Sequence, residues 1–361
     1  MTAEESVIKA PAGDLQQPHA SEALGADPGL LRSLWASITA VFAKEARWRM
    51  RGRRAFVVMT VYVALLGLLV LAVYQLIYDR SQFQFGFNMA RVATDQVSGN
   101  VSASIGQAIF TAILILQTLL TMMLAPALTS GAISAEREKQ TMDLLITTPV
   151  STLGLVLGKL VSSLAFVLLL IVASVPLMSL VFAFGGVAPE DVIRAYVVLF
   201  VMAFGIGSIG MLMSAVFKRT QVATAVAYLI AFVLTIGTLA FHTYLTISAQ
   251  APFNDPSDVR PAPEALLWLN PLVTDIDLLC TAIPDTFGFT CSYIAMIQGN
   301  ELGAFAEQPR DSFWPKSALA FALVGIGATL LTTQLIAPSR RLRGWRGRAD
   351  AAPVAAADAP P

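Results

Sequence analysis

Six long apolar runs constrain this chain more than any other feature of its sequence. Each run is close to the roughly 20 residues that an α-helix needs to cross a bilayer. The runs are Ala55 to Tyr78, Ile105 to Ala127, Leu160 to Phe184, Val192 to Phe217, Val222 to Leu245 and Ser317 to Ala337. Composition agrees, because 56% of the residues are hydrophobic and 13% are charged, whereas soluble domains carry about 25% charged residues. The sequence therefore predicts an all-α integral protein of the cell membrane (inner or plasma membrane) with six transmembrane helices.

Basic residues between the runs predict how the helices are oriented. Lys and Arg gather before the first run, around the segment 133–151, between the fourth and fifth runs, and after the sixth. The remaining loops carry fewer basic residues, set among more numerous acids. Because cytoplasmic loops are enriched in Lys and Arg, both termini and the segment 133–151 are predicted to be cytoplasmic. The loop over residues 248–315 is then predicted to lie outside.

The two ends of the chain differ in composition from the apolar runs. Residues 1–28 have no apolar period, which is typical of a disordered tail, and no apolar stretch that would indicate a cleaved signal peptide. Residues 29–54 place apolar side chains around Trp35 at helical spacing and then a basic cluster, which predicts an amphipathic interfacial helix and a topology anchor. An anionic-lipid or nucleic-acid patch is the alternative for that cluster. Residues 55–339 form the predicted membrane domain, and residues 340–361 form a basic and then Ala/Pro-rich cytoplasmic tail.

The segment 133–151, ISAEREKQTMDLLITTPVS, separates the second apolar run from the third. Its charge cluster cannot lie in hydrocarbon, where one charge costs about 2.5 to 3.5 kcal/mol. Ser134 is a candidate helix cap, the acids that follow suit the positive end of a helix dipole, and Pro149 ends the element. The apolar side chains that share one face are Met142, Leu145 and Ile146. The pattern predicts one short amphipathic cytoplasmic helix from Ser134 to Ile146.

These residues resemble a pattern of ABC-2 type transporter permeases. In that family the stretch after the second membrane helix looks like E-R-E-x-G-T-x-E-x-L-L-x-T-P-x-S, followed by G-K. The positions that match here are Glu136, Arg137, Glu138, Thr141, Leu145, Thr148, Pro149, Ser151, Gly158 and Lys159. Gln140 stands where the family usually has Gly, and Asp143 stands where it usually has Glu. The first departure concerns the local turn, and the second shortens a carboxylate.

The resemblance implies the membrane subunit of an ATP-driven exporter, with a six-helix ABC-2 permease domain over residues 55–339. Two permease copies, identical or homologous, would each bind a separate ABC ATPase subunit, and the short helix would lie in a cleft of that ATPase. The ATPase-coupling residues that the resemblance implies are Glu136, Arg137, Glu138, Thr141 and Asp143. The residues expected to seat the helix against the spans are Met142, Leu145, Ile146 and Pro149.

The same resemblance assigns the chemistry to the partner. ATP and Mg would be bound by the ATPase, so this chain is not expected to be an enzyme or to hold a cofactor. Two Cys and two His are too few for a zinc or iron–sulfur centre of about four such ligands, and no metal site is expected. Membrane lipid is an expected partner, and nucleic acid is not.

Three motifs suggest chemistry that their context does not support. The sequence GIGSIG at 205–210 matches the dinucleotide fingerprint, but it lies within the fourth run, where small residues let helices approach closely. The sequence GLVLGKL at 154–160 is similar to a phosphate loop, but it is one residue short and lacks the Ser or Thr that reaches magnesium. Ser208 and His242 are available for an intramembrane hydrolase, but the helical rise places them too far apart.

Two further features concern the outer side and the third run. Cys280 and Cys291 are a possible disulfide, which would contribute about 3 kcal/mol, and the alternative is two free thiols. Pro176 is expected to bend the third helix, in a way that is either used for gating or simply tolerated.

The outer loop 248–315 contains one further apolar stretch. Residues from Ala265 to Leu279 are predicted to form an interfacial helix rather than a seventh span, because Asn270, Asp275 and Asp277 interrupt the stretch.

The spans contain almost no charge, which favours a lipid-like or amphipathic cargo over a small ion. The alternative function is an ATP-driven mechanical or regulatory membrane subunit that acts on an extracytoplasmic partner through residues 248–315.

Overall fold

The computed structural model describes residues 53–88, 94–140, 152–249, 263–283 and 313–336, together with Thr39, Phe42 and Cys291. Every regular element in these ranges is a helix. Those long and apolar enough to cross a membrane are Phe56–Asp79, Val101–Glu138, Thr152–Phe184, Pro189–Val216, Thr220–Ser248 and Trp314–Ile336. The predicted all-α class and the six transmembrane helices are therefore confirmed. The predicted helix around Trp35, the two tails and residues 141–151 lie outside the described ranges.

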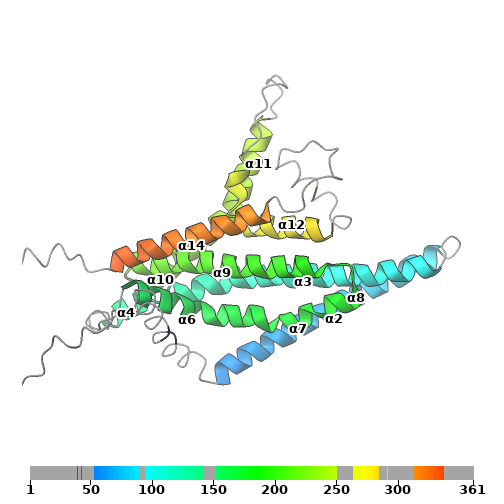
Figure 1. The fold of residues 1–361 in the computed structure, drawn as a ribbon, viewed down its shortest axis with the longest axis horizontal. Coiled ribbons are helices and arrows are strands. Elements are labelled where there is room, and N and C mark those ends of the chain that lie inside the picture. Colours follow the sequence, from blue (N-terminus) through cyan, green and yellow to red (C-terminus); the bar gives the residue numbers. More distant parts are fainter. Residues whose placement is uncertain are drawn as a thin grey trace, which may run out of the picture.

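The bundle is centred on α9 (Pro189–Val216), which is the most buried of the six spans (Figure 1). It packs against α14 (Trp314–Ile336), α3 (Thr94–Thr129), α6 (Thr152–Ala173) and α10 (Thr220–Phe232). A helix enclosed in this way needs small residues on several faces, because its neighbours must approach closely.

The glycines of the GIGSIG motif are the small residues on three of those faces. Gly205 faces α14, Gly207 faces α6 and Gly210 faces α3. A Cβ atom on Gly205 would lie 2.8 Å from the carbonyl oxygen of Phe321, and one on Gly207 would lie 2.6 Å from a methyl carbon of Leu164. The prediction that this motif packs helices is confirmed.

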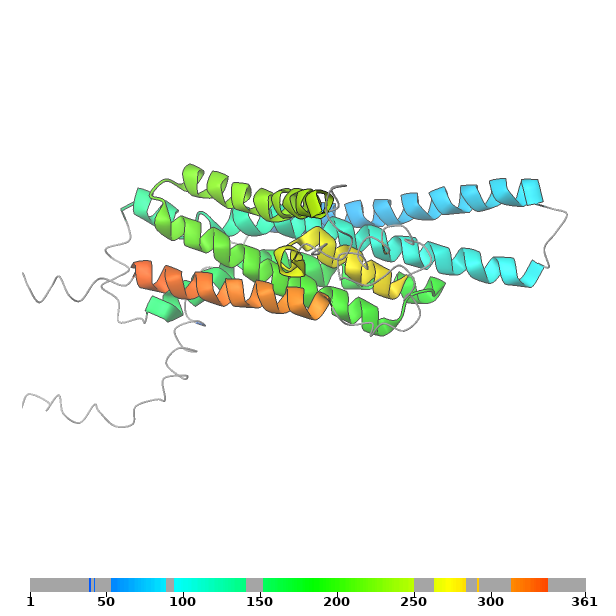
Figure 2. The same cartoon turned by 90° about the horizontal axis from the view of Figure 1, so that it is seen from above.

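The first two spans extend beyond the others. α2 (Arg53–Asn88) and α3 each contain 36 residues, or about 54 Å of helix, whereas the hydrocarbon core of a bilayer is about 30 Å thick. Both helices project past the ends of α9 and α14 (Figures 1 and 2). The pair is therefore longer than the core of a bilayer requires.

The third span is broken near Pro176, as expected. α6 ends at Ala173, and two short helices, α7 (Val175–Met178) and α8 (Leu180–Phe184), continue the path. Ser174 lies at the break, and its hydroxyl donates a hydrogen bond to the Ile171 carbonyl at 2.7 Å. The serine thus satisfies a carbonyl at the point where the regular helix ends.

The fifth span contains a π-helical turn that its sequence did not indicate. α10 leads into η2 (Val233–Gly237), and α11 (Thr238–Ala249) then leaves the bundle (Figure 1). π-helical turns inside α-helices are frequent at functional sites. The predicted continuous helix from Val222 to Leu245 is therefore correct in extent but not straight.

The segment before the last span folds into the bundle. A 3₁₀ turn, η4 (Glu264–Leu267), precedes α12 (Pro271–Ala282), which lies along α3 and α9 and reaches α14 (Figures 1 and 2). The polar residues that were expected to mark an interfacial helix, Asn270, Asp275 and Asp277, are all buried. The stretch is not among the helices long and apolar enough to cross a membrane, as expected, and its position at the membrane interface stays a prediction.

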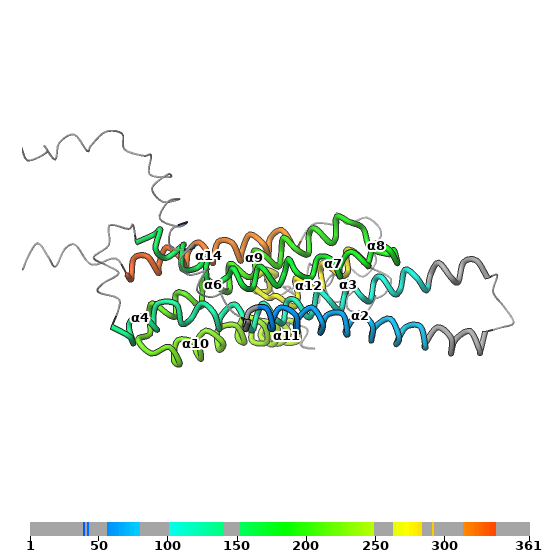
Figure 3. Tube along the Cα trace, turned by 90° about the horizontal axis from the view of Figure 1, so that it is seen from below, coloured from blue at the N-terminus to red at the C-terminus, as the bar shows by residue number. Residues whose placement is uncertain are grey.

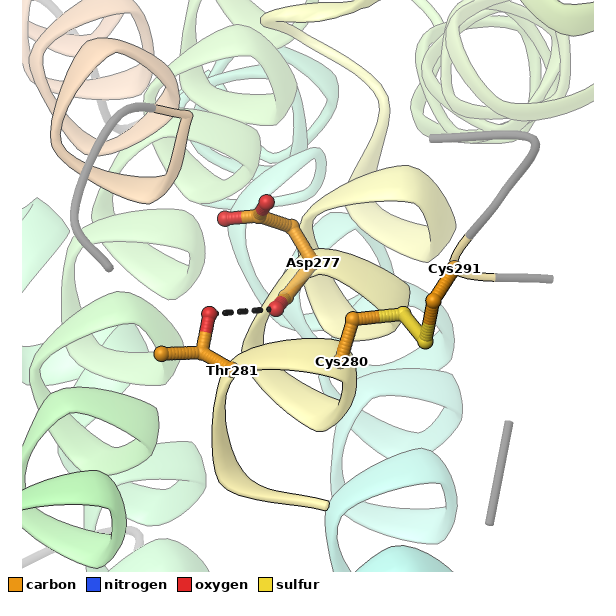
Figure 4. Close-up of a disulfide and its surroundings, with 4 residues drawn as sticks. All are labelled: Asp277, Cys280, Thr281 and Cys291. Carbon is orange, nitrogen blue, oxygen red and sulfur yellow. Dashed lines mark hydrogen bonds between the residues drawn. A yellow bond between two sulfur atoms is a disulfide. The ribbon is translucent and has the colours of Figure 1, made fainter. Parts of the chain in front are cut away.

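A disulfide joins the C-terminal half of α12 to a residue that follows the helix. Cys280 and Cys291 are bonded, with their Cα atoms 5.4 Å apart (Figure 4). The hydroxyl of Thr281 donates a hydrogen bond to the Asp277 carbonyl at 2.8 Å on another face of the helix. The Asp277 side chain points away from the disulfide (Figure 4).

Candidate functional site

The charged segment begins with α4 (Ser134–Glu138), a short helix at one end of the bundle. α4 follows α3 through a tight turn and lies beside the start of α10 (Figures 1 and 3). The predicted helix from Ser134 to Ile146 is wrong in its length, because α4 ends at Glu138.

The residue that accounts for the early end is Gln140. Its φ angle is 56°, in the left-handed region, and a residue in that region cannot continue a right-handed helix. The ABC-2 pattern usually has Gly at this position, and Gly reaches the left-handed region without a Cβ clash. The departure noted in the sequence therefore falls on a residue whose backbone conformation favours glycine.

The N-terminus of α4 is capped from another helix. The Ser214 hydroxyl of α9 accepts hydrogen bonds from the backbone N–H groups of Ile133 and Ser134, each at 2.9 Å. Ser134 itself does not cap the helix, contrary to the sequence prediction, and its hydroxyl donates instead to the Ser130 carbonyl at 3.0 Å. Because the first N–H groups of a helix have no partner within it, Ser214 fixes α4 to α9.

Glu138 of α4 in turn caps the N-terminus of α10. Its carboxylate accepts a hydrogen bond from the backbone N–H of Thr220 at 2.8 Å and from the Thr220 hydroxyl at 2.9 Å. Thr220 is the first residue of α10, and the residue before it, Arg219, makes no side-chain cap. A carboxylate at this position suits the positive end of the helix dipole. Glu138 therefore caps α10 from α4.

Arg137 binds the opposite kind of helix end. Its guanidinium donates a hydrogen bond to the carbonyl of Ala215 at 2.5 Å. Ala215 lies in the last turn of α9, where carbonyl groups have no partner within the helix. A cation there is favoured by the negative end of the helix dipole.

Glu136 binds the third neighbour, α6. Its carboxylate forms an ion pair with the ammonium group of Lys159, which also donates to the Ala132 carbonyl at 3.2 Å. Lys159 is 3% exposed, so the ammonium group of α6 is buried. The Glu136 carboxylate and the Ala132 carbonyl compensate for its burial. An uncompensated buried ammonium would be strongly unfavourable.

Glu136, Arg137 and Glu138 are therefore brought together on one short helix, and each binds a different helix. The predicted site residues that lie outside the described part of the chain are Thr141, Met142, Asp143, Leu145, Ile146 and Pro149. Sequence reasoning missed Ser214 and Thr220 as partners, and no local signal marks them. Lys159 carried a signal, since a cation within an apolar helix requires a nearby acceptor or anion.

The other motifs do not form a reaction centre. Ser208 accepts a hydrogen bond from the Thr329 hydroxyl at 3.3 Å, whereas the His242 ring nitrogens have no hydrogen-bond partner among the described residues. The sequence GLVLGKL at 154–160 is helical rather than a loop. Over the described ranges, no group of three His, Cys, Asp or Glu residues could hold a metal ion.

The fold and its polar end define a multi-pass membrane protein built as a helical bundle, with a short charged helix tied to three of the spans. Comparison with protein families matches residues 39–286 to the model described as "ABC-2 family transporter protein". The chain belongs to this family, and it is a membrane permease component of an ABC system. No curated protein matches the chain.

Proposed function

We propose that this chain is the membrane-spanning permease subunit of an ATP-driven ABC-2 type exporter, and that α4 and the residues after it bind a separate ATPase subunit. The observation that carries the proposal is the set of links made by α4. It is continuous with α3 through a turn, Glu136 pairs with α6, Arg137 and Ser214 join it to α9, and Glu138 caps α10. A force applied to α4 would therefore act on four membrane helices at once.

Exposure supports contact with a water-soluble partner. Glu138, Lys139 and Gln140 are exposed at the end of α4. Thr141 and Asp143, which come next among the polar residues of the sequence, are proposed to contact the same partner. Family membership supports an ABC ATPase as that partner.

The ATPase would bind ATP and Mg, and this chain would hydrolyse neither ATP nor another substrate. Two permease copies, identical or homologous, would assemble with two ATPase subunits. The cargo that the spans favour is lipid-like or amphipathic, because a pathway for small ions normally contains charges within the membrane.

The test measures ATP hydrolysis and transport by the complex of the permease with its candidate ATPase in vesicles. Glu136→Gln breaks the link to α6 without adding a charge, and we expect the ATPase to be retained while transport per ATP falls. The exchanged pair Glu136→Lys with Lys159→Glu should restore part of the transport. Glu264→Gln is the matched control, because it breaks an ion pair with Lys316 far from α4. Failure of the wild type to retain any ATPase would overturn the proposal.

A second function is favoured by the length of α2 and α3. Because these helices project well beyond the bundle, an ATP-driven mechanical or regulatory subunit acting on an extracytoplasmic partner is the alternative. Cargo transport in vesicles that contain only the permease and the ATPase would favour the exporter. ATP hydrolysis that moves no cargo and responds to an added extracytoplasmic protein would favour the alternative.

A further inference from the structure

α12 is fixed to its neighbours by polar contacts on several faces. Asn270 caps its N-terminus, accepting from the N–H groups of Leu272 and Val273, and donates to the Thr235 carbonyl in the π-helical turn at 2.7 Å. The Thr274 hydroxyl bonds to the Ser317 hydroxyl of α14 at 2.6 Å. α12 therefore bridges the irregular part of the fifth span and the start of the sixth.

A second contact to α14 uses a carboxylate. Asp277 accepts a hydrogen bond from the backbone N–H of Trp314 at 3.0 Å, at the first residue of α14. Asp277 thus has a structural role that suits an ionised carboxylate at a helix N-terminus.

Asp275 differs from these polar residues, because its side chain makes no such contact among the described residues. It is 2% exposed, and among the described residues neither of its side-chain oxygens accepts a hydrogen bond. The group that faces it is the Thr118 hydroxyl of α3, which is also buried and outside hydrogen-bonding geometry with any described partner. A buried carboxylate without a cation or hydrogen-bond donors is strongly unfavourable, and such a group takes up a proton instead.

Among the described residues, no charged group on a neighbouring element compensates Asp275. The side chains of α3 that the structure describes, those of residues 101–129, include no ionisable group. The charges at the start of α9 pair among themselves, since Arg194 binds Asp191 and Glu190.

The same holds for the other elements packed on α12. On α14, Lys316 pairs with Glu264 of η4. The π-helical turn η2 has no ionisable residue, and Asp277 of α12 itself is occupied by the start of α14. Burial therefore raises the pKa of the Asp275 carboxyl to about 8, and the Thr118 hydroxyl acts in the opposite direction.

We propose that Asp275 is a proton-binding site, and that its protonation holds α12 against α3 while loss of the proton releases this contact. The ligand is a proton rather than a metal cation, because Asp275 and Thr118 supply too few oxygens for hard cations, which take about six or more. By the positive-inside prediction, the site lies on the extracytoplasmic side of the bundle, at the opposite end of α14 from α4. The proposal goes beyond the proposed exporter function and does not depend on it, because it needs no ATPase.

The first experiment detects the proton directly. Infrared difference spectra of the full-length chain in lipid vesicles at about neutral pH compare wild type with Asp275→Asn. We expect the wild type to show the carbonyl stretch of a protonated carboxylic acid, shifted by deuterium exchange and absent from the variant. Asp191→Asn is the control, because Asp191 pairs with Arg194, and the band should remain in it. A wild type without the band, or a band that persists in Asp275→Asn, overturns the proposal.

The second experiment measures release of α12. Leu278 is buried one helical turn from Asp275 on the same face, so Leu278→Cys places a reporter thiol at the contact with the bundle. The native cysteines are bonded to each other and leave this thiol as the reactive one. The rate of labelling by a maleimide is measured in Leu278→Cys and in Leu278→Cys combined with Asp275→Asn. The rate with Asp275 is divided by the rate with asparagine, and this ratio cancels the titration of the thiol.

We expect that ratio to rise about tenfold between about pH 7 and about pH 9, in proportion to the ionised fraction of the carboxyl. Asp275→Glu should retain a pH-dependent ratio. A ratio that stays constant with pH shows that ionisation does not move α12, and it overturns the proposed release.

Discussion

The ammonium group of Lys159 in α6 contacts the carboxylate of Glu136 in α4, across 23 positions of the chain. The two residues stand at opposite ends of the stretch that resembles the ABC-2 pattern, the first in its E-R-E part and the second in its G-K part. The pair therefore fixes the two ends of the segment 137–158 to each other. A partner that binds this segment would push on both α4 and α6.

Removing the carboxylate should destabilise the fold. Glu136→Gln leaves the Lys159 ammonium buried with only the Ala132 carbonyl, and breaking a buried pair costs about 3 to 5 kcal/mol. The Glu136 side chain is 25% exposed, so water solvates part of the site and we expect a loss nearer about 2 kcal/mol. Thermal unfolding in detergent, followed by circular dichroism, measures it.

Two variants control that measurement. Glu264→Gln breaks the more exposed pair with Lys316 and should cost less than about 1 kcal/mol. Glu136→Gln combined with Lys159→Met removes both charges and should recover most of the loss. Equal losses in Glu136→Gln and Glu264→Gln would contradict the buried character of the first pair.

Ser214 should be needed for the start of α4. Ser214→Ala removes the acceptor for the N–H groups of Ile133 and Ser134, and loss of such a cap costs about 1 kcal/mol. Hydrogen exchange at both amides should become faster. Ser179→Ala is the matched control, because that hydroxyl is bonded to the Pro176 carbonyl at an exposed site far from α4. Unchanged exchange in Ser214→Ala would show that α4 is capped in another way.

The glycines should differ according to what faces them. In Gly205→Ala the new methyl group meets the Phe321 carbonyl, and forcing extra volume into a packed interface costs about 1 to 3 kcal/mol. Gly327→Ala lies on α14 with nothing within 4 Å of the new methyl, and there the higher helix propensity of Ala should add up to about 1 kcal/mol. Opposite shifts in the unfolding temperature are expected, and two shifts of the same sign would refute the packing role of Gly205.

The parts of the fold that the sequence predicts are those with local causes. The six spans follow from runs of apolar residues, and the packing role of the 205–210 glycines follows from their place within a span. The chain beyond Glu138 was predicted as helix from its apolar period, which does not show that Gln140 takes a left-handed conformation.

The partners of the charged residues depend on contacts between distant parts of the chain. Ser214 caps a helix that begins 80 positions earlier, and Thr220 is 82 positions from Glu138. The burial of Asp275 has the same origin, because α12 packs against α3, α9 and α14, which come from other parts of the chain. No periodicity in one segment contains that information.

Stability should depend on pH through Asp275. Burial raises the pKa of this carboxyl from 3.8 to about 8 in the folded state, so the folded chain holds a proton that the unfolded chain releases. The contribution is therefore fully present below about pH 4 and is lost as the pH rises to about 8, by up to about 1.4 kcal/mol per pH unit.

The measurement compares the unfolding temperature of wild type and Asp275→Asn across this range of pH. Asparagine is neutral at every pH, so the difference between the two proteins should shift steadily against the wild type as the pH rises. A difference that does not vary with pH would show that Asp275 keeps the same proton occupancy when the chain unfolds.

Gln140 offers a stabilising substitution. An L-residue in the left-handed region is strained by roughly 1 to 2 kcal/mol, and glycine relieves that strain but loses more chain entropy on folding, so Gln140→Gly should gain up to about 1 kcal/mol. Lys139→Gly is the matched control, because Lys139 has a φ angle of −83° in the right-handed region and glycine should destabilise it. Thermal unfolding of the two variants should shift in opposite directions. A loss of stability in Gln140→Gly equal to that in Lys139→Gly would show that the turn after α4 does not require a left-handed residue.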